Sequence, residues 1–294
     1  MIERVEEHVP LARYTTIGTG GPARWFARPE SIDELRASLA WARSEGVSVE
    51  VLGLGSNVLA ADEGVDALVL KLAGELAAVH LEGAELVAGG GATNAVCLHR
   101  ARDAGLGGFE FASAIPGTVG GGVRMNAGAY GREFRDVLVE AVVVDGDGAR
   151  RLGGVELDLS YRHSSLRPGE VVAEARIRLE RSTTAEVKAR VVELLAQRKA
   201  TQPTNKRTFG SVFKNPDGGP GAGRMIEECG LKGFALGGAV ISPRHANFIE
   251  NTGRATSADC IALMAESRRR VLERFGYELE HEVRLLGDLV LPVL

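Results

Sequence analysis

The 294-residue sequence contains little cysteine, and its three cysteines are odd in number and far apart: Cys97, Cys229 and Cys260. Their spacing matches neither a zinc site nor a disulfide framework. We therefore expect no metal site and a reducing, cytoplasmic environment.

The sequence also lacks long apolar runs and an excess of positive charge. No stretch approaches the roughly 18 apolar residues that a membrane span requires. The N-terminus, M-I-E-R-V-E-E-H, is acidic and has no apolar signal-peptide core. A net charge of −4 argues against a general nucleic-acid binder. We expect a protein without nucleic-acid or membrane partners, and, as no oligomer is indicated, a monomer.

What is present is typical of a soluble globular protein with two or three domains, since domains usually have roughly 100–200 residues. Hydrophobic residues make up 45% and charged residues 25% of the chain. The pattern is α+β, with a strand-rich first part and a smaller α/β part. The composition changes at Arg181-Ser182-Thr183-Thr184, which predicts one domain over 1–181 and another over 182–294.

Local patterns predict the principal elements. Ser31, Thr93 and Ser257 are expected to cap helices. The expected helices cover 31–44, 93–104, 184–200, 223–229 and 257–275, and the expected strands cover 67–72, 85–88, 138–144, 171–179 and 277–286. A further short strand is expected within 14–22, and Arg268-Arg269-Arg270 is expected to form a solvated face.

The most informative stretch runs from Phe109 to Gly131 and contains the sequence I-P-G-T-V-G-G-G-V-R-M-N-A-G-A-Y-G. Glycine allows the backbone to approach a ligand closely, and successive backbone N–H groups form a concave anion site. Pro116 and a first helical turn from Thr118 would frame such a site. We interpret the stretch as a diphosphate cradle; the alternative is a glycine-rich packing turn.

A second glycine turn supports the cradle interpretation. Val49 to Asn57 reads V-E-V-L-G-L-G-S-N, a strand followed by a turn in which Ser56 and Asn57 add polar side chains. Two glycine turns after strands fit a long ligand with a charged middle.

Three polar segments could carry chemistry. Arg162, in S-Y-R-H-S-S, could bind a carboxylate in a bidentate pair or could be a surface arginine. Ser211, in G-S-V-F-K-N-P, could donate a proton or only bond the backbone, and Lys214 with Asn215 suits phosphate or sugar oxygens. Glu282, in E-H-E-V-R, could serve a site or an edge-strand ion pair.

Seven motifs, in order along nearly the whole chain, resemble the UDP-N-acetylenolpyruvoylglucosamine reductase family. The flavin-binding half of that family is similar to V-L-G-L-G-S-N-V-L, I-P-G-T-V-G-G and M-N-A-G-A-Y-G. Its substrate-binding half is similar to Y-R-H-S, G-S-V-F-K-N-P, H-A-N-F-I and H-E-V-R.

The resemblance implies a flavoenzyme of peptidoglycan precursor synthesis, with consequences for cell shape and cell division. Residues 1–181 would be an FAD-binding domain of the PCMH or vanillyl-alcohol-oxidase type, with subdomains at about 1–72 and 73–181. Residues 182–294 would be the substrate-binding domain. FAD would contact the two glycine stretches through Gly53, Leu54, Gly55, Ser56, Asn57, Pro116, Gly117, Thr118, Gly120, Gly121, Asn126, Gly128 and Ala129.

The resemblance also implies the reaction and the catalytic residues. NADPH would reduce FAD, which would then reduce UDP-N-acetylglucosamine enolpyruvate to UDP-N-acetylmuramate. Arg162 and Glu282 would stabilise developing negative charge, Glu282 only if protonated, and Ser211 would protonate the carbanion. Lys199, Lys214 and Asn215 would bind the nucleotide diphosphate and sugar.

The sequence departs from the family pattern in places. No insertion with a tyrosine lies between Tyr161 and Ser211, so the chain resembles the shorter class. Ala235 stands where the family often has arginine, and His163 where it often has Asp or Asn.

Two other functions fit parts of the pattern. A flavin-dependent oxidase of the same fold would need a His or Cys to link the flavin, and neither glycine stretch contains one. A nucleotide-sugar-binding regulator would keep the lysines but would need neither Ser211 nor both glycine turns.

Overall fold

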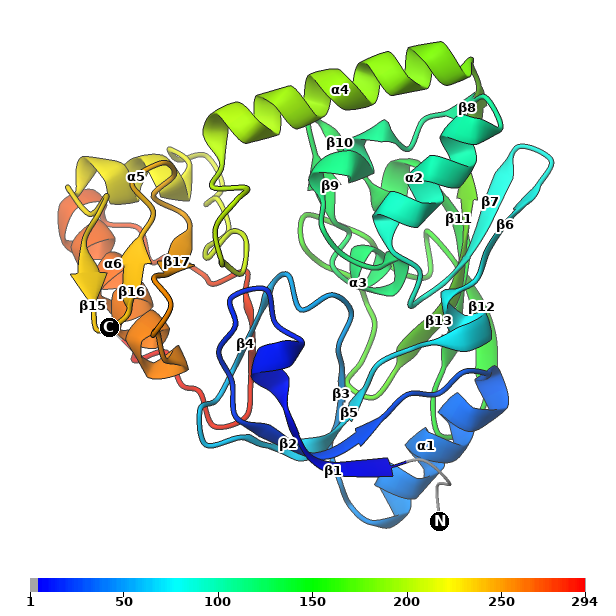
Figure 1. Ribbon diagram of the computed structural model, residues 1–294, viewed down its shortest axis with the longest axis horizontal. Coiled ribbons are helices and arrows are strands. Elements are labelled where there is room, and N and C mark those ends of the chain that lie inside the picture. The colour runs from blue at the N-terminus through cyan, green and yellow to red at the C-terminus, as the bar shows by residue number, and fades with distance from the viewer. Residues whose placement is uncertain (1–4, 294) are drawn as a thin grey trace. The chain divides into compact units, whose positions relative to one another are not determined.

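The computed structural model describes residues 5–293. The start of the acidic N-terminal stretch therefore lies outside the described residues. Figure 1 shows helices α1 (Ile32–Ser44), α2 (Asn94–Asp103), α3 (Val119–Arg124), α4 (Thr184–Thr201), α5 (Ala222–Glu228) and α6 (Ser257–Phe275). The strands are β1 (Val5–Pro10), β2 (Pro22–Ala27), β3 (Val49–Val51), β4 (Val58–Ala60), β5 (Val65–Leu70), β6 (Val79–Glu82), β7 (Glu85–Gly89), β8 (Leu106–Gly107), β9 (Gly128–Ala129), β10 (Arg132–Glu133), β11 (Leu138–Val144), β12 (Ala149–Gly153), β13 (Val171–Arg178), β14 (Glu180–Arg181), β15 (Ala235–Leu236), β16 (Ala239–Ile241), β17 (Ile249–Asn251) and β18 (Arg284–Leu286).

The described chain forms two compact units, each built from separate stretches of sequence. The first contains the chain up to Glu7, Trp25–Leu54 and Ala67–Arg198. The second contains His8–Arg24, Gly55–Asp66 and the chain from Lys199 onward. The expected functional domains, 1–181 and 182–294, follow a different division and stay a prediction.

The first unit is organised around a sheet of five strands in the order β12-β11-β13-β7-β6, with antiparallel neighbours. Both faces of this sheet are covered. Ala141 and Val143 of β11 enter one apolar core, and Val142 and Val144 enter another together with Leu35 of α1. Burial on both faces explains why this strand is a nearly continuous apolar run rather than an alternating one.

The second unit packs α6 against the sheet β15-β16-β17 (Figure 1). Its core draws on distant parts of the sequence, since Ile17 and Leu59 are buried with Met264 and other residues of the C-terminal part. β18 pairs in parallel with β4, with Arg284 opposite Val58. The last strand is therefore held by a segment from the first quarter of the chain.

Several expectations about single elements need correction. Helix α6 is capped by Thr256 rather than Ser257. The expected strand within 14–22 does not form, because β2 begins only at Pro22, and the expected strand over 277–286 is restricted to β18. Ser31 and Thr93 cap α1 and α2 as expected.

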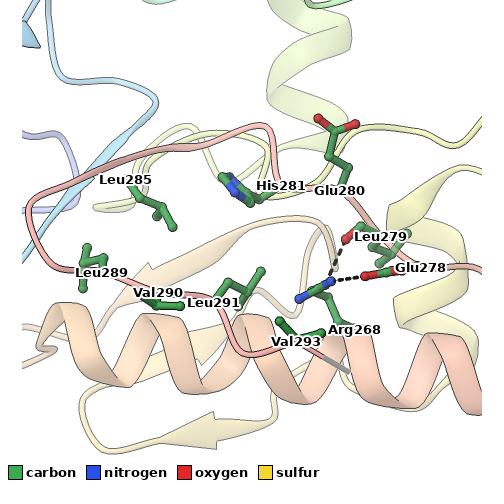
Figure 2. A pocket seen from close by; sticks show the side chains of 10 residues that line it. All are labelled: Arg268, Glu278, Leu279, Glu280, His281, Leu285, Leu289, Val290, Leu291 and Val293. Atoms are coloured by element: carbon green, nitrogen blue, oxygen red, sulfur yellow. Dashed lines mark hydrogen bonds and ion pairs between the residues drawn. The ribbon is translucent and has the colours of Figure 1, made fainter.

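The expectation that Arg268 lies on a solvated face is wrong, because this residue is only 9% exposed. Its guanidinium donates to Leu279 O and Pro292 O and pairs with Glu278. Figure 2 shows Arg268 turned toward Glu278 and Leu279. It lines a cavity of about 480 Å³. The cavity contains none of the predicted catalytic side chains, and we assign it to the packing of the tail on α6.

The cysteines are packing residues. Cys97 and Cys260 are buried, Cys229 is half-buried, and all three are free thiols. Burial raises the pKa of both buried thiols to about 12, so they are poor nucleophiles near neutral pH. None of the helices within residues 5–293 has the length and apolar character of a membrane span.

Candidate active site

Gly53 of the first predicted glycine turn meets Thr118 of the second within the first unit. A Cβ atom on Gly53 would lie 2.6 Å from Thr118 Oγ1, so only glycine lets the first turn approach the second this closely. Thr118 caps α3, its hydroxyl accepting a long bond from Gly121 N. The backbone amides of Leu54 and Gly117 have no acceptor among the described residues, so donors remain on both turns.

A third glycine stretch, G-G-G-A-T at 89–93, supports the second turn, and the sequence reasoning did not single it out. Gly90 O accepts from Gly120 N at 2.8 Å, and Ala92 O accepts from Val119 N at 2.9 Å. The three consecutive glycines directly after a predicted strand were the sequence feature that could have identified this stretch. They let this segment reach α3 with its backbone.

The three consecutive glycines of α3 have different roles. A Cβ on Gly120 would lie 2.9 Å from Gly90 O, and one on Gly122 would lie 2.3 Å from Cζ of the buried Phe134. Both are therefore required for packing. A Cβ on Gly121 would have only Thr118 Oγ1 nearby, at 3.6 Å, and would otherwise project into open space. Packing does not explain why Gly121 is glycine, whereas close approach of a ligand does.

Two buried polar atoms near the second turn have unused hydrogen-bonding capacity. Among the described residues, Asn94 Oδ1 and Ser113 Oγ are the buried side-chain atoms that lack a hydrogen-bond partner. Asn94 is tied to the turn, its amide Nδ2 donating to Ile115 O at 3.0 Å. Ser113 lies just before that segment. Buried polar atoms are normally satisfied, so this pair indicates that something polar completes the turn.

Lys71 is a further residue at the first turn that the sequence reasoning missed. Its Nζ donates to Gly53 O at 2.6 Å. Burial, followed by the charge of Arg28, lowers the pKa of its ammonium group. Lys71 thus fixes the turn and brings positive charge to it, and no local sequence signal connects the two residues.

The remaining predicted cofactor residues connect the second glycine stretch to the Arg162 loop. Asn126 is fully buried, donates to Ser160 O at 2.9 Å and accepts from Arg135 N. Gly128 and Ala129 form β9. The side chain of Asn126 is therefore already engaged in holding the loop that carries Arg162.

Arg162 has an unusual backbone conformation, with φ at +54°. Non-glycine residues rarely adopt this region, and such strain is often found at functional sites. The guanidinium lies 4.9 Å from the centre of the Tyr161 ring and donates to Gly128 O at 3.3 Å. These contacts direct Arg162 toward the backbone of the predicted cofactor stretch.

Ser211 and Glu282 lie on neighbouring segments of the second unit. Glu282 N donates to Val212 O at 2.8 Å, and Phe213 forms an isolated antiparallel β-bridge with His281. Ser211 is half-buried, and among the described residues its hydroxyl has no hydrogen-bond partner. The structure therefore brings these two predicted residues together, while Arg162 belongs to the first unit.

The predicted substrate-binding residues have different surroundings. Lys214 pairs with Glu280 at 2.6 Å. The side-chain oxygen of Asn215 accepts from Ala222 N and so caps α5, a role the sequence reasoning missed. Lys199 is exposed near the end of α4.

Comparisons with known proteins show what the two parts of the chain are similar to. Residues 23–153 match the FAD binding domain family, and residues 202–286 match the C-terminal domain of UDP-N-acetylenolpyruvoylglucosamine reductase. The chain is 43% identical to UDP-N-acetylenolpyruvoylglucosamine reductase 2 of Symbiobacterium thermophilum, over 97% of this chain and 92% of the relative. It is 45% identical to the reductase of Anaeromyxobacter dehalogenans, over 95% of this chain and 84% of the relative.

A solved structure is similar over almost the whole chain. The crystal structure of UDP-N-acetylenolpyruvylglucosamine reductase from Thermus caldophilus has a TM-score of 0.85 and 38% sequence identity. The similarity covers 97% of this chain and 99% of that chain.

Proposed function

The chain belongs to the UDP-N-acetylenolpyruvoylglucosamine reductase family, and from this premise we propose how its residues carry out the reaction. It is an oxidoreductase that uses FAD and NADPH in peptidoglycan precursor synthesis. It reduces UDP-N-acetylglucosamine enolpyruvate to UDP-N-acetylmuramate. The expected α+β architecture, an FAD-binding fold with a smaller C-terminal domain, is confirmed.

The observation that carries the assignment is the meeting of the two glycine turns. Bound FAD would supply the chemistry for hydride transfer between NADPH and the enolpyruvyl group. The amides of Leu54 and Gly117 and the open side of Gly121 would hold its diphosphate. Asn94 Oδ1 would accept a hydrogen bond from a donor group of FAD, and the Ser113 hydroxyl could donate or accept one.

Arg162 and Glu282 are proposed to stabilise the charge that develops on the substrate. Adding hydride to the enolpyruvyl methylene carbon places negative charge on the neighbouring carbon and its carboxylate. A guanidinium can bind that carboxylate through two parallel hydrogen bonds. Glu282 can donate a hydrogen bond there in its protonated form.

Ser211 is proposed to donate the proton that completes the reduction. Its hydroxyl has no partner among the described residues, so the proton is not committed to a protein acceptor. The backbone of Glu282 bonds to Val212, the residue after Ser211, and the Glu282 carboxyl would be the polar neighbour that a weak acid such as serine requires.

Lys199, Lys214 and Asn215 are proposed to bind the nucleotide part of the substrate. Asn215 would contact a sugar or phosphate oxygen, while its side-chain oxygen caps α5. Lys214 would share its charge between Glu280 and the diphosphate. We also propose a monomer that works in the cytoplasm, where free thiols such as Cys97 and Cys260 persist.

The test is the visible spectrum of the purified protein under anaerobic conditions. NADPH should bleach the flavin absorbance, and UDP-N-acetylglucosamine enolpyruvate should restore it. A flavin that bleaches but does not recover would reject the substrate. A protein with no flavin signal after FAD is supplied would reject the cofactor and leave a nucleotide-sugar-binding protein as the better hypothesis.

A further inference from the structure

The turn that carries Ser211 is held from both sides by asparagine side chains of the second unit. Phe209, Val212 and Phe213 are buried and anchor the turn in the core, while Ser211 between them is half-buried. On one side, Asn247 donates to Phe213 O at 2.8 Å and accepts from Phe213 N at 3.0 Å. This leaves the segment before Val212 to be fixed by something else.

Asn57 fixes that segment. Its Nδ2 donates to Phe209 O at 2.8 Å and to Ser211 O at 3.0 Å, the two carbonyls on either side of Gly210. Gly210 has a φ of +74°, and a Cβ there would lie 3.4 Å from Asn57 Nδ2 and 3.2 Å from Ser56 O. Glycine thus lets the turn bend around the asparagine amide.

The backbone of Asn57 reaches the other predicted catalytic segment. Its carbonyl accepts from Arg284 N at 3.0 Å, two residues beyond Glu282. Glu282 N in turn donates to Val212 O at 2.8 Å. One residue therefore bonds directly to the serine turn and to the strand that follows Glu282.

We propose that Asn57 is a positioning residue that sets the place of the Ser211 hydroxyl relative to the Glu282 segment. The inference rests on the proposed function, because it concerns the proton-donating step. Both hydrogens of the Asn57 amide are used by protein carbonyls, so its side chain has none left to donate to a cofactor phosphate. Within the G-S-N motif, the role of Asn57 is then to connect the first glycine turn to the turn that carries Ser211.

The test compares Asn57→Ala with Asn251→Ala in the FAD-loaded protein. Asn251 is a matched control, because its Nδ2 also donates to a backbone carbonyl of the same unit, Ile17 O at 2.9 Å. Stopped-flow absorbance would follow flavin reduction by NADPH and reoxidation by the enolpyruvate separately. We expect Asn57→Ala to slow reoxidation by about tenfold or more, since small misplacements of reacting groups have effects of this size. Reduction and FAD content should change much less than reoxidation does, and Asn251→Ala should leave both rates near wild type.

A double-mutant cycle with Ser211→Ala separates positioning from a general loss of structure. If Asn57 acts through the serine hydroxyl, Asn57→Ala should slow reoxidation little further when that hydroxyl is absent. A full additional loss in the Ser211→Ala background would overturn the proposal. Loss of FAD, or equal slowing of both half-reactions, would overturn it as well, because Asn57 would then serve the cofactor.

Hydrogen exchange provides a readout that does not depend on activity. In Asn57→Ala the amides of Val212 and Glu282 should exchange faster than in wild type and in Asn251→Ala. Unchanged exchange would show that Asn57 does not hold the turn. If wild-type flavin fails to recover with the enolpyruvate, the proposed function fails, and exchange at these amides still decides whether Asn57 holds the turn.

Discussion

At the scale of single residues, the site depends on which groups are already committed to protein partners. Asn126 and Asn215 both carry amides that the sequence assigned to ligands, yet each is bonded to backbone groups. Ser211 is the opposite case, since its hydroxyl is unpartnered among the described residues. The contrast makes Ser211 the more direct candidate for chemistry.

Replacing Ser211 with alanine should separate the two half-reactions. Ser211→Ala removes the proposed proton donor, so reoxidation by the enolpyruvate should slow by about 100-fold or more. Reduction by NADPH should be unchanged, because that step needs no proton from this residue. Rapid-mixing absorbance measures both, with Ser165→Ala as a control, since Ser165 Oγ donates to Glu156 O, away from the proposed chemistry. Equal slowing of the two steps would remove the proton-donor role.

The neighbouring glycines of α3 allow a second residue-scale prediction. Gly121→Ala should leave the melting temperature unchanged or slightly raised, because alanine favours a helix by about 0.5–1 kcal/mol over glycine. It should weaken FAD binding by about tenfold, equivalent to about 1.4 kcal/mol, because the new methyl group enters the open side of the turn.

Gly122→Ala is the matched comparison. Its methyl group would clash with the Phe134 ring and should destabilise the fold by about 1–3 kcal/mol. Thermal unfolding measures the stability of the two variants, and flavin titration measures their affinity for FAD. Unaltered FAD affinity in Gly121→Ala would contradict the placement of the cofactor at this turn.

At the scale of elements, local signals were sufficient where the partners are a few residues apart. Ser31 and Thr93 cap their helices as their sequences indicate. The cap of α6 could also have been found, because Thr256 and Asp259 have the spacing of a capping box. The burial of Arg268 could not have been predicted from the sequence. Three consecutive arginines point in different directions around a helix, and only the contacts of the C-terminal tail determine which of them is buried.

Asp259 gives the element-scale prediction. Its carboxylate accepts from Gly238 N and Thr256 N at 2.9 and 3.0 Å, and these bonds, Gly238 first, lower its pKa. The unfolded chain therefore takes up this proton first as the pH falls. The stabilisation is present well above the ordinary pKa of 3.8 and is lost as the pH falls through and below it.

Asp259→Asn should reduce the free energy of unfolding by about 1 kcal/mol at pH 7 and by less at pH 3. Urea unfolding at the two pH values measures the difference. Asp33→Asn is the control, because the Asp33 side chain is 95% exposed. A deficit that is the same at both pH values would show that the charge of Asp259 is not what stabilises the cap.

At the scale of the whole molecule, the sequence revealed the family and most elements but not the composition of the second unit. Composition changes near residue 181 suggested a continuous C-terminal domain. The core of the second unit instead includes Ile17 and Leu59, and β18 pairs with β4. Contacts between residues this far apart leave no local periodicity, so only the structure shows them.

A fragment experiment follows from this composition. Residues 182–294 expressed alone lack the stretches His8–Arg24 and Gly55–Asp66. We expect the fragment to show no cooperative thermal transition, whereas the full chain should show one. Circular dichroism during heating distinguishes the cases, and a cooperatively melting fragment would establish the predicted domain as independent.

The mixed origin of the second unit also sets the order in which it can be completed during synthesis. Ile17 and Leu59 leave the ribosome early, whereas Met264 and Leu279, which belong to the same core, are made near the end. The cores of the first unit use residues no later than Val191. Translation can therefore finish the flavin-binding cores while two segments of the other unit still wait for partners that do not yet exist. The newborn chain has to keep those apolar side chains from aggregating until its last residues emerge.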